Sequence, residues 1–247
     1  MKLLLLAGTS DARRIADDLV GLDGLEVTAS LAGVTRRPLP FPCPVRIGGF
    51  GGEDGFKAYL KSNKIDAVVD ATHPFAVQMS RTAAAVCQGC TIPHIQMLRG
   101  GWSPSAGDNW TSVPNEAAVA AHVPEGATVF LATGRQTLDA FHNLQNRKLI
   151  CRQIDPSDRP FPFANGIFLI GRPPFSVEQE KTLFRDLGVD WLVVKNSGAE
   201  ASRTKLDAAR ALGIKVAMID RPKQPDCIRV RRVAEAVAWV KSQMNAA

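Results

Sequence analysis

The sequence is poor in the features that mark several classes of protein. Among its 247 residues there is one tyrosine, and the lysines and arginines are dispersed, so we expect no aromatic-interleaved surface for nucleic acid. No apolar run approaches the roughly 20 residues that a membrane helix needs, so no membrane partner is expected. The five cysteines are an odd number spread thinly along the chain, which predicts reduced thiols.

Signals for secretion and for metal binding are also weak. The apolar stretch at residues 3–6 is too short for a signal peptide, and charged residues follow it at once, so we expect a cytoplasmic protein. Cys87 and Cys90 have the spacing of a redox or zinc pair. However, there is no second pair, and this one falls late in an expected helix rather than at its N-terminus. We therefore expect small buried residues at these positions and no metal site.

What the chain has instead is a series of short aliphatic runs that stop at small, polar, often glycine-bearing segments. Such runs are typical of buried parallel strands when helical stretches separate them. The polar segments then lie at the carboxyl ends of the strands, where open α/β sheets bind ligands. The pattern therefore predicts a protein built around one cleft. Six runs show it: residues 3–6, 27–31, 45–47, 65–69, 129–132 and 191–194.

A loop-rich stretch at residues 99–107 separates two series of strands and helices. The predicted fold class is α/β, with two Rossmann-like domains whose parallel sheets face each other across the cleft. We assign residues 1–100 to the first domain and residues 101–247 to the second. Helices are expected, among other places, at residues 74–87, 115–122, 136–144, 202–212 and 230–244.

The first strand, turn and helix favour binding of a phosphate. The turn lacks the full G-x-G-x-x-G fingerprint, but Gly8 allows close approach of the backbone, and Thr9 and Ser10 add hydroxyl groups. Asp11 opens the following helix, whose N-terminus presents backbone N–H groups and a positive dipole end. The alternative is that Ser10 or Asp11 only caps the helix.

The second and third strands indicate which dinucleotide is bound. An NAD-binding unit carries an acidic residue about 20 positions after its glycine turn, whereas residues 28–37 contain no acid and end in Arg36 and Arg37. An arginine here favours a 2′-phosphate and hence NADPH, and we expect Arg36 to bind it; a solvated basic loop is the alternative. The glycines at residues 48–52 allow a flat group such as adenine to lie against the backbone, or they form an ordinary flexible loop.

The fourth strand ends in Asp70 and His73, the only adjacent acid and imidazole on a strand-end loop. In a Rossmann-type order this strand lies across the switch point, where a nicotinamide ring would reach. Both residues are candidates for catalytic proton handling. Alternatively, Asp70 and Thr72 are turn and cap residues, and His73 packs against the ring.

The expected second domain offers cations and hydrogen-bond donors at strand ends. Arginine and lysine beside helix starts suit carboxylates or phosphates, and the net charge of +6 favours an anionic partner. For Lys205, a solvated helix face is the alternative. The candidate substrate-binding residues are Arg135, Lys195, Asn196, Ser197, Thr204 and Lys205.

Taken together, these segments resemble the precorrin-6A reductase family of cobalamin (vitamin B12) biosynthesis. The likeness covers nearly the whole chain in the family's order. The sequence departs from the family in the first turn, where two glycines and a glutamate are common, and at Ala199, where a second glycine is common. The main matching segments are Gly8-Thr9-Ser10-Asp11-Ala12-Arg13, Ser30-Leu31-Ala32-Gly33, Gly48-Gly49-Phe50-Gly51-Gly52, Asp70-Ala71-Thr72-His73-Pro74-Phe75-Ala76, Thr133-Gly134-Arg135 and Lys195-Asn196-Ser197-Gly198.

The resemblance implies a reductase that uses NADPH to transfer a hydride to one double bond of precorrin-6A, giving precorrin-6B. It also implies a tetrapyrrole substrate that carries many carboxylates, which would occupy the cations of the second domain. Nothing in the sequence fixes the oligomeric state. The expected cofactor-binding residues are Gly8, Thr9, Ser10, Asp11, Leu31, Gly33, Arg36, Gly49, Phe50, Gly51, Thr72, Pro74 and Phe75.

Two other functions are compatible with paired Rossmann-like domains. A nucleotide-sugar transferase would bind a nucleotide diphosphate and show no preference for a 2′-phosphate. A non-catalytic NADP-sensing module would bind the dinucleotide tightly without turnover.

Overall fold

The computed structural model describes residues 1–33, 36 and 38–246. They divide into two compact units. Unit 1 combines Met1–Gly100 with the C-terminal segment from Pro222 onward, and unit 2 is Gly101–Arg221. The expected boundary near residue 100 agrees with this division, whereas the assignment of the whole C-terminal stretch to the second domain is wrong. Arg37 lies outside the described residues.

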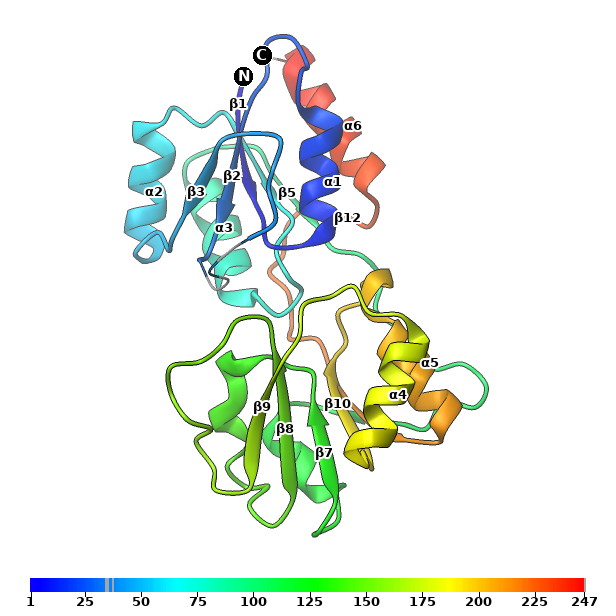
Figure 1. Ribbon diagram of the computed structural model, residues 1–247. Coiled ribbons are helices and arrows are strands. Elements are labelled where there is room, and N and C mark those ends of the chain that lie inside the picture. Colours follow the sequence, from blue (N-terminus) through cyan, green and yellow to red (C-terminus); the bar gives the residue numbers. More distant parts are fainter. Residues whose placement is uncertain (34–35, 37, 247) are drawn as a thin grey trace. The chain divides into compact units, whose positions relative to one another are not determined.

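Unit 1 contains a six-stranded parallel sheet in the order β3-β2-β1-β4-β5-β12 (Figure 1). Three of the predicted aliphatic runs form β1, β2 and β4 at its centre, because a strand covered on both faces needs apolar side chains throughout, and the fourth forms the edge strand β3. The strand order reverses between β1 and β4, and such a switch point opens a crevice at the carboxyl ends of the strands. The strands are β1 (Lys2–Leu6), β2 (Glu26–Leu31), β3 (Val45–Ile47), β4 (Ala67–Asp70), β5 (His94–Met97) and β12 (Arg229–Val230).

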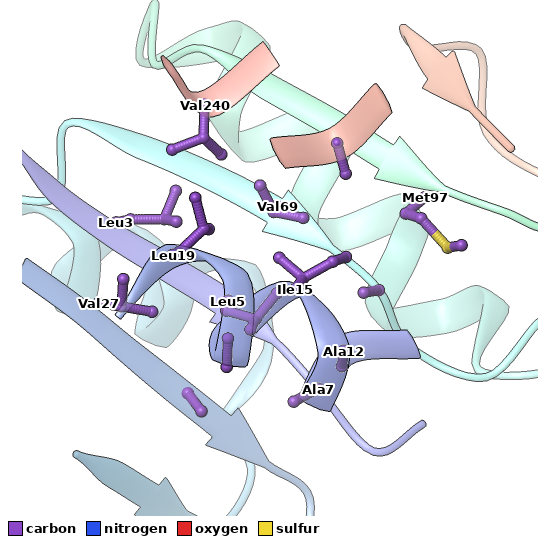
Figure 2. Packing of buried hydrophobic residues seen from close by; sticks show 14 of the residues in the cluster. Leu3, Leu5, Ala7, Ala12, Ile15, Leu19, Val27, Val69, Met97 and Val240 are labelled. Atoms are coloured by element: carbon purple, nitrogen blue, oxygen red, sulfur yellow. The ribbon is translucent and has the colours of Figure 1, made fainter. Parts of the chain in front are cut away.

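Helices cover both faces of this sheet. Alternate residues of β1 point in opposite directions, as strand geometry requires. Leu3 and Leu5 pack in a core with helices α1 and α6 (Figure 2). Leu4 and Leu6 pack on the other face with helices α2 and α3. The bounds of these helices are α1 Ser10–Leu19, α2 Gly52–Ser62, α3 Val77–Gly89 and α6 Val233–Ala246.

The C-terminal segment belongs to unit 1 because its apolar residues are buried there. Ala236 and Val240 of α6 are fully buried in the core that contains β1 and α1, and Figure 2 shows Val240 above Leu3 and Leu19. Just before α6, the strand β12 pairs with β5 in parallel. A two-residue strand contains no aliphatic run, so the pattern that predicts the other strands does not reveal it.

Unit 2 contains a second parallel sheet, in the order β9-β8-β7-β10-β11-β6. The central order is the same as in unit 1, with a switch point between β7 and β10. The sixth strand differs in origin: β6 precedes the rest of its sheet in the sequence, whereas β12 follows all of unit 2. The strands are β6 (Trp110–Val113), β7 (Thr128–Leu131), β8 (Lys148–Gln153), β9 (Gly166–Ile170), β10 (Trp191–Lys195) and β11 (Lys215–Ile219).

The helices of unit 2 agree only in part with expectation. Helices α4 (Val177–Leu187) and α5 (Thr204–Leu212) pack on one face of the sheet, around Phe130, Leu192 and Val216. The helices expected at residues 115–122 and 136–144 are instead the short 3-10 helices η1 (Ala117–Ala121) and η2 (Arg135–Phe141). Likewise, residues 200–202 form the 3-10 helix η3 (Glu200–Ser202) before α5 begins.

Local sequence accounts for the short helices. Prolines at positions 114 and 124 bracket η1, and a proline disfavours helical conformation in the residue before it. In η2, Thr137 has non-helical dihedral angles (φ −112°, ψ 16°) that break the segment.

The cysteines pack as small residues. All five are free thiols, and Cys87 and Cys151 are fully buried. Burial raises the pKa of Cys87 to about 12 and that of Cys151 to about 11, so neither supplies a thiolate near neutral pH. Among the described residues, no cluster of three or more histidine, cysteine or acidic side chains has the geometry to hold a metal ion. No helix in the same part of the chain is long and apolar enough to cross a bilayer.

Candidate functional site

The turn between β1 and α1 is shaped by Thr9. Its hydroxyl accepts a hydrogen bond from the backbone N–H of Ala12 (3.1 Å), which caps α1, and donates one to the carbonyl of Ala71 (2.7 Å). Thr9 thus joins the loops that follow β1 and β4, the two strands at the switch point. Because the hydroxyl proton is already used, we assign Thr9 to shaping the turn rather than to a side-chain contact with a ligand.

Gly8 and Ser10 lie on the exposed side of this turn. Gly8 has φ +122°, a conformation that favours glycine, and a Cβ atom added there would meet no protein atom within 4 Å. The space over its backbone is therefore open. An open backbone surface at a helix N-terminus beside the switch point fits the pyrophosphate of a dinucleotide.

Asp11, in the first turn of α1, is buried and forms an ion pair with Arg99, which follows β5. The pairing holds a cation near the N-terminus of α1. Arg99 was not among the predicted residues, because an arginine in a loop-rich stretch has no pattern that links it to a distant aspartate.

The loops after β2 and β3 lie against each other. Gly48 donates its backbone N–H to the carbonyl of Leu31 (2.9 Å). Gly33 has φ +81°, a conformation that favours glycine, and a Cβ atom there would press against Ile47 at 3.1 Å. Arg36 is exposed and follows this contact by three positions.

The glycine-rich segment after β3 is an ordered turn that Arg46 organises. Its guanidinium donates to Ser30 Oγ (2.8 Å) and to the carbonyls of Gly48 (2.8 Å) and Gly49 (3.0 Å). It also lies over the ring of Phe50, 3.9 Å from the centroid, and Gly51 caps α2 with φ +81°. These contacts argue against the alternative of an ordinary flexible loop.

The loop after β4 supports the turn interpretation of Asp70 and Thr72. Asp70 is fully buried, and its Oδ1 accepts from the backbone N–H (3.0 Å) and hydroxyl (2.7 Å) of Thr72. The expected role of Thr72 as N-cap of the next helix is wrong. Helix α3 begins at Val77 with Ala76 as its cap residue, because the Asx turn at Asp70 and Thr72 engages the Thr72 hydroxyl instead.

A chain of side chains ties this loop to the C-terminal segment. Gln96 of β5 donates from Nε2 to Asp70 Oδ2 (3.5 Å) and to Gln224 Oε1 (3.0 Å), and its Oε1 accepts from Arg229 Nε (2.8 Å). Gln224 in turn donates to the carbonyl of Pro74 (2.9 Å). The segment that returns from unit 2 therefore fixes the loop that carries His73.

His73 has one tautomer favoured by its surroundings. The backbone N–H of Phe75 lies 3.3 Å from His73 Nδ1 and donates to it, so in the neutral ring the proton is on Nε2. The ring is half-buried beside Phe75, with the two centroids 5.7 Å apart, and Pro74 between them is buried. The contact with Phe75 therefore determines which ring nitrogen of His73 carries the proton.

In unit 2, the predicted cations lie at the carboxyl ends of β7 and β10, at the second switch point. Arg135 is exposed at the start of η2. Lys195 Nζ donates to Thr137 Oγ1 (3.0 Å) and forms an ion pair with Glu116 Oε1 (3.3 Å). The end of β10 is thus linked to η2 through Thr137 and to the N-cap residue of η1, Glu116.

Asn196 is engaged in the structure of unit 2. Its side chain accepts from the backbone N–H of Trp102 (2.7 Å) and donates to the carbonyl of the same residue (3.1 Å), and its own carbonyl accepts from Arg221 Nε (2.7 Å). Trp102 and Arg221 are near the two ends of unit 2, so Asn196 anchors both. Ser197 beside it is buried. These contacts favour a positioning role for Asn196 over direct contact with a substrate.

Thr204 and Lys205, at the start of α5, line a cavity of about 150 Å³. Its other lining residues include Arg152 and Glu180, which the sequence analysis did not single out. Arg152 could have been found, because it is a charged residue directly after the short apolar stretch at residues 149–151. Glu180 could not, since a glutamate on a helix is ordinarily solvated.

Two polar residues at the same sheet edge also lack partners within the described part of the chain. Thr133 Oγ1 and both amide atoms of Gln153 are buried without a hydrogen bond there. They lie two positions beyond the paired residues Leu131 and Cys151. Buried polar atoms in native proteins are rarely left unsatisfied, so this edge of unit 2 has hydrogen-bonding capacity to spare.

Comparison with known proteins identifies the relatives of this chain. A family model described as "Precorrin-6x reductase CbiJ/CobK" matches residues 2–241. The chain belongs to this family. The resemblance recognised in the sequence is confirmed, and so is the α/β fold class with two parallel sheets.

Individual relatives match over most of their length. A precorrin-6A reductase of Rhodococcus erythropolis is 44% identical over 241 residues, 97% of this chain and 97% of the relative. A cobalt-precorrin-6A reductase of Priestia megaterium is 33% identical over 237 residues, 90% of this chain and 91% of the relative. A solved structure of CobK precorrin-6A reductase is 38% identical, with a TM-score of 0.93 over 98% of this chain and 97% of its own.

Proposed function

We propose that this protein is an NADPH-dependent reductase that adds a hydride to one double bond of precorrin-6A to give precorrin-6B in cobalamin biosynthesis. The observation that carries the proposal is the family match along residues 2–241. The exposed backbone at Gly8 and the Rossmann strand order of unit 1 support a dinucleotide as the cofactor.

We propose NADPH rather than NADH because the end of β2 offers a cation and no acid. The exposed Arg36 is the residue to hold a 2′-phosphate by charge-assisted hydrogen bonds. The backbone around Gly8, Ser10 and Asp11 would hold the pyrophosphate. The remaining cofactor contacts would come from Leu31, Gly33, Gly49, Phe50, Gly51, Thr72, Pro74 and Phe75.

When bound, NADPH supplies the hydride, and the protein's task is to orient the reactants and provide a proton. Asp70 is fully buried, so we assign it to positioning the loop rather than to proton transfer. His73, whose Nε2 carries the proton in its favoured tautomer, is the candidate proton donor.

The substrate class follows from the cations of unit 2. Arg135, Lys195, Thr204 and Lys205 would bind carboxylates of the macrocycle, with Ser197 as a further donor. Metal-free precorrin-6A is favoured over its cobalt complex by similarity: the precorrin-6A reductases are 38% to 44% identical to this chain, and the cobalt-precorrin-6A reductases 28% to 33%.

The direct test is anaerobic incubation of the purified protein with precorrin-6A and either NADPH or NADH, with the tetrapyrrole absorbance followed over time. We expect reduction with NADPH and much slower reduction with NADH. A parallel reaction with cobalt-precorrin-6A tests the preference for the metal-free substrate. Tight NADPH binding with no change in the tetrapyrrole spectrum would support the sensing module instead, and equal use of the two nucleotides would remove the role of Arg36.

A further inference from the structure

Arg13 lies in the first turn of α1, and its side chain is half-buried. The guanidinium carbon is 5.6 Å from the centre of the Phe41 ring. Its Nε atom is buried and has no hydrogen-bond partner among the described residues, which is rare for a buried polar atom in a native protein. Arg13 therefore has hydrogen-bonding capacity that the described part of the fold does not use.

The acidic residues of α1 do not neutralise the charge of Arg13. Asp11 is already paired with Arg99. Asp17 lies one turn farther along the helix and is exposed, and within the described ranges no ion pair joins it to Arg13. The guanidinium is thus a cation whose one close contact in these ranges is the face of the Phe41 ring.

The contact with Phe41 places Arg13 beside the segment that joins β2 to β3. Phe41 and Cys43 pack against the core that contains α1 and β2, and the backbone N–H of Ala29 in β2 donates to the carbonyl of Pro44 (2.9 Å). Because α1 begins directly after β1, its first turn lies at the carboxyl edge of the sheet. Arg13 is therefore at this edge, on the side of β2, where a Rossmann unit receives the 2′ position of the adenosine ribose.

The charge of a 2′-phosphate requires more than one cation. A phosphate monoester carries about 1.5 to 2 negative charges at pH 7 and has three acceptor oxygens, so Arg36 alone would neither neutralise it nor occupy all its acceptors. A guanidinium can donate two parallel hydrogen bonds to one phosphate. A guanidinium that stacks on a ring still has the N–H groups in its own plane for such a partner.

We propose that Arg13 is a second residue that binds the 2′-phosphate of NADPH, and that Phe41 is a positioning residue that holds its guanidinium. The inference rests on the proposed function for its ligand. It adds a cation from α1 to the one from the loop after β2. The preference for NADPH over NADH would then depend on two elements of the chain rather than on one.

The test measures dissociation constants for NADPH and NADH by fluorescence, and for 2′,5′-ADP and 5′-AMP by displacement of NADPH. The members of each pair differ only in the 2′-phosphate. Arg13→Met removes the charge and keeps an unbranched side chain over Phe41. Arg14→Met is the matched control, because Arg14 is the next residue of the same helix and is exposed, so both variants change the net charge equally.

We expect Arg13→Met to raise the dissociation constants for NADPH and 2′,5′-ADP about tenfold, as loss of charge-assisted hydrogen bonds should. The constants for NADH and 5′-AMP should not change, and Arg14→Met should bind all four nucleotides as the wild type does. Arg13→Lys keeps the charge and should recover part of the affinity for NADPH. Phe41→Leu removes the cation–π contact and should weaken NADPH binding about threefold, with NADH binding unchanged.

Equal losses for NADPH and NADH in Arg13→Met overturn the assignment, because they would place Arg13 at a part of the cofactor that both share, such as the pyrophosphate. Unchanged affinities for NADPH and 2′,5′-ADP overturn it too, as does an equal loss in Arg14→Met, which would reflect net charge alone. A wild type that shows these variant effects but does not reduce precorrin-6A contradicts the proposed activity and supports the assignment. A wild type that binds NADPH no better than NADH overturns both the assignment and the proposed cofactor.

Discussion

The two sheets share one strand order, yet their carboxyl ends use polar side chains in different ways. In unit 1, the side chains of Thr9, Arg46 and Asp70 all form hydrogen bonds within or between the strand-end turns. In unit 2, Thr133 and Gln153 keep polar atoms without partners among the described residues, and burial and the neighbouring Arg152 lower the pKa of Lys205. In unit 1 these side chains therefore hold the backbone of the turns in place, which suits a dinucleotide that is bound by main-chain groups. Unit 2 presents side chains, which suits a ligand with many carboxylates.

The largest expected effect comes from the buried ion pair of unit 2, in which Arg152 of β8 makes two parallel hydrogen bonds to Glu180 of α4 (2.8 Å and 2.7 Å). Glu180→Ala leaves the Arg152 guanidinium buried without its counter-charge, and such a change costs about 3–5 kcal/mol. The free energy of unfolding from urea titration measures it. Glu178→Ala is the control on the same helix, because Glu178 is 76% exposed in an i,i+3 pair with Lys181 and should change stability by less than about 0.5 kcal/mol. Similar values for the two variants would show that the pair does not stabilise unit 2.

The corresponding test in unit 1 removes one hydroxyl. Thr9→Val keeps the shape of the side chain but leaves the Ala12 N–H and the Ala71 carbonyl without a partner, which should cost about 1–3 kcal/mol. NADPH affinity should fall with it, because the turn that holds the phosphate loosens. Thr9→Ser keeps the hydroxyl and should remain near wild type in both measurements. If Thr9→Val lowers NADPH affinity with no loss of stability, the hydroxyl contacts the cofactor directly and our assignment is wrong.

Much of this organisation can be predicted from the sequence, because it follows from local composition. The aliphatic runs identify the central strands, since few other environments accept so many consecutive apolar residues. Strand β12 cannot be predicted from the sequence pattern, because two residues are too few to show a periodicity. Its position depends on pairing with β5, which lies more than a hundred residues earlier in the chain. The hydrogen bonds of Asp70 cannot be predicted from the sequence for another reason. A carboxylate after a strand can face a ligand or its own backbone, and only the folded loop decides between them.

Arg36 is the residue of unit 1 whose exposed side chain has a proposed ligand of its own. Arg36→Ala should weaken NADPH binding about tenfold, or about 1.4 kcal/mol, since a charge-assisted bond to the 2′-phosphate is lost. NADH binding should not change, because NADH lacks that phosphate. Fluorescence titration of both nucleotides measures the two constants. An equal loss of affinity for NADPH and NADH would indicate a damaged loop. Unchanged affinity for both would show that Arg36 does not bind the 2′-phosphate.

The smallest expected effect is the pH dependence caused by Lys205, whose charged neighbours are Arg152 of β8 and Glu180 of α4. It distinguishes the contribution of the Lys205 charge to folding from its contribution to binding. The folded protein lowers the pKa of Lys205 from 10.5 to about 8, so between these values the unfolded chain binds more protons. Stability should therefore rise with pH across this window, whereas affinity for precorrin-6A should fall as the ammonium is lost. Unfolding and binding measured at pH 7 and pH 9.5, as differences between wild type and Lys205→Met, isolate this group from other titrating residues. Stability and affinity should therefore move in opposite directions, and an affinity that rises together with stability would show that the charge of Lys205 does not contribute to binding precorrin-6A.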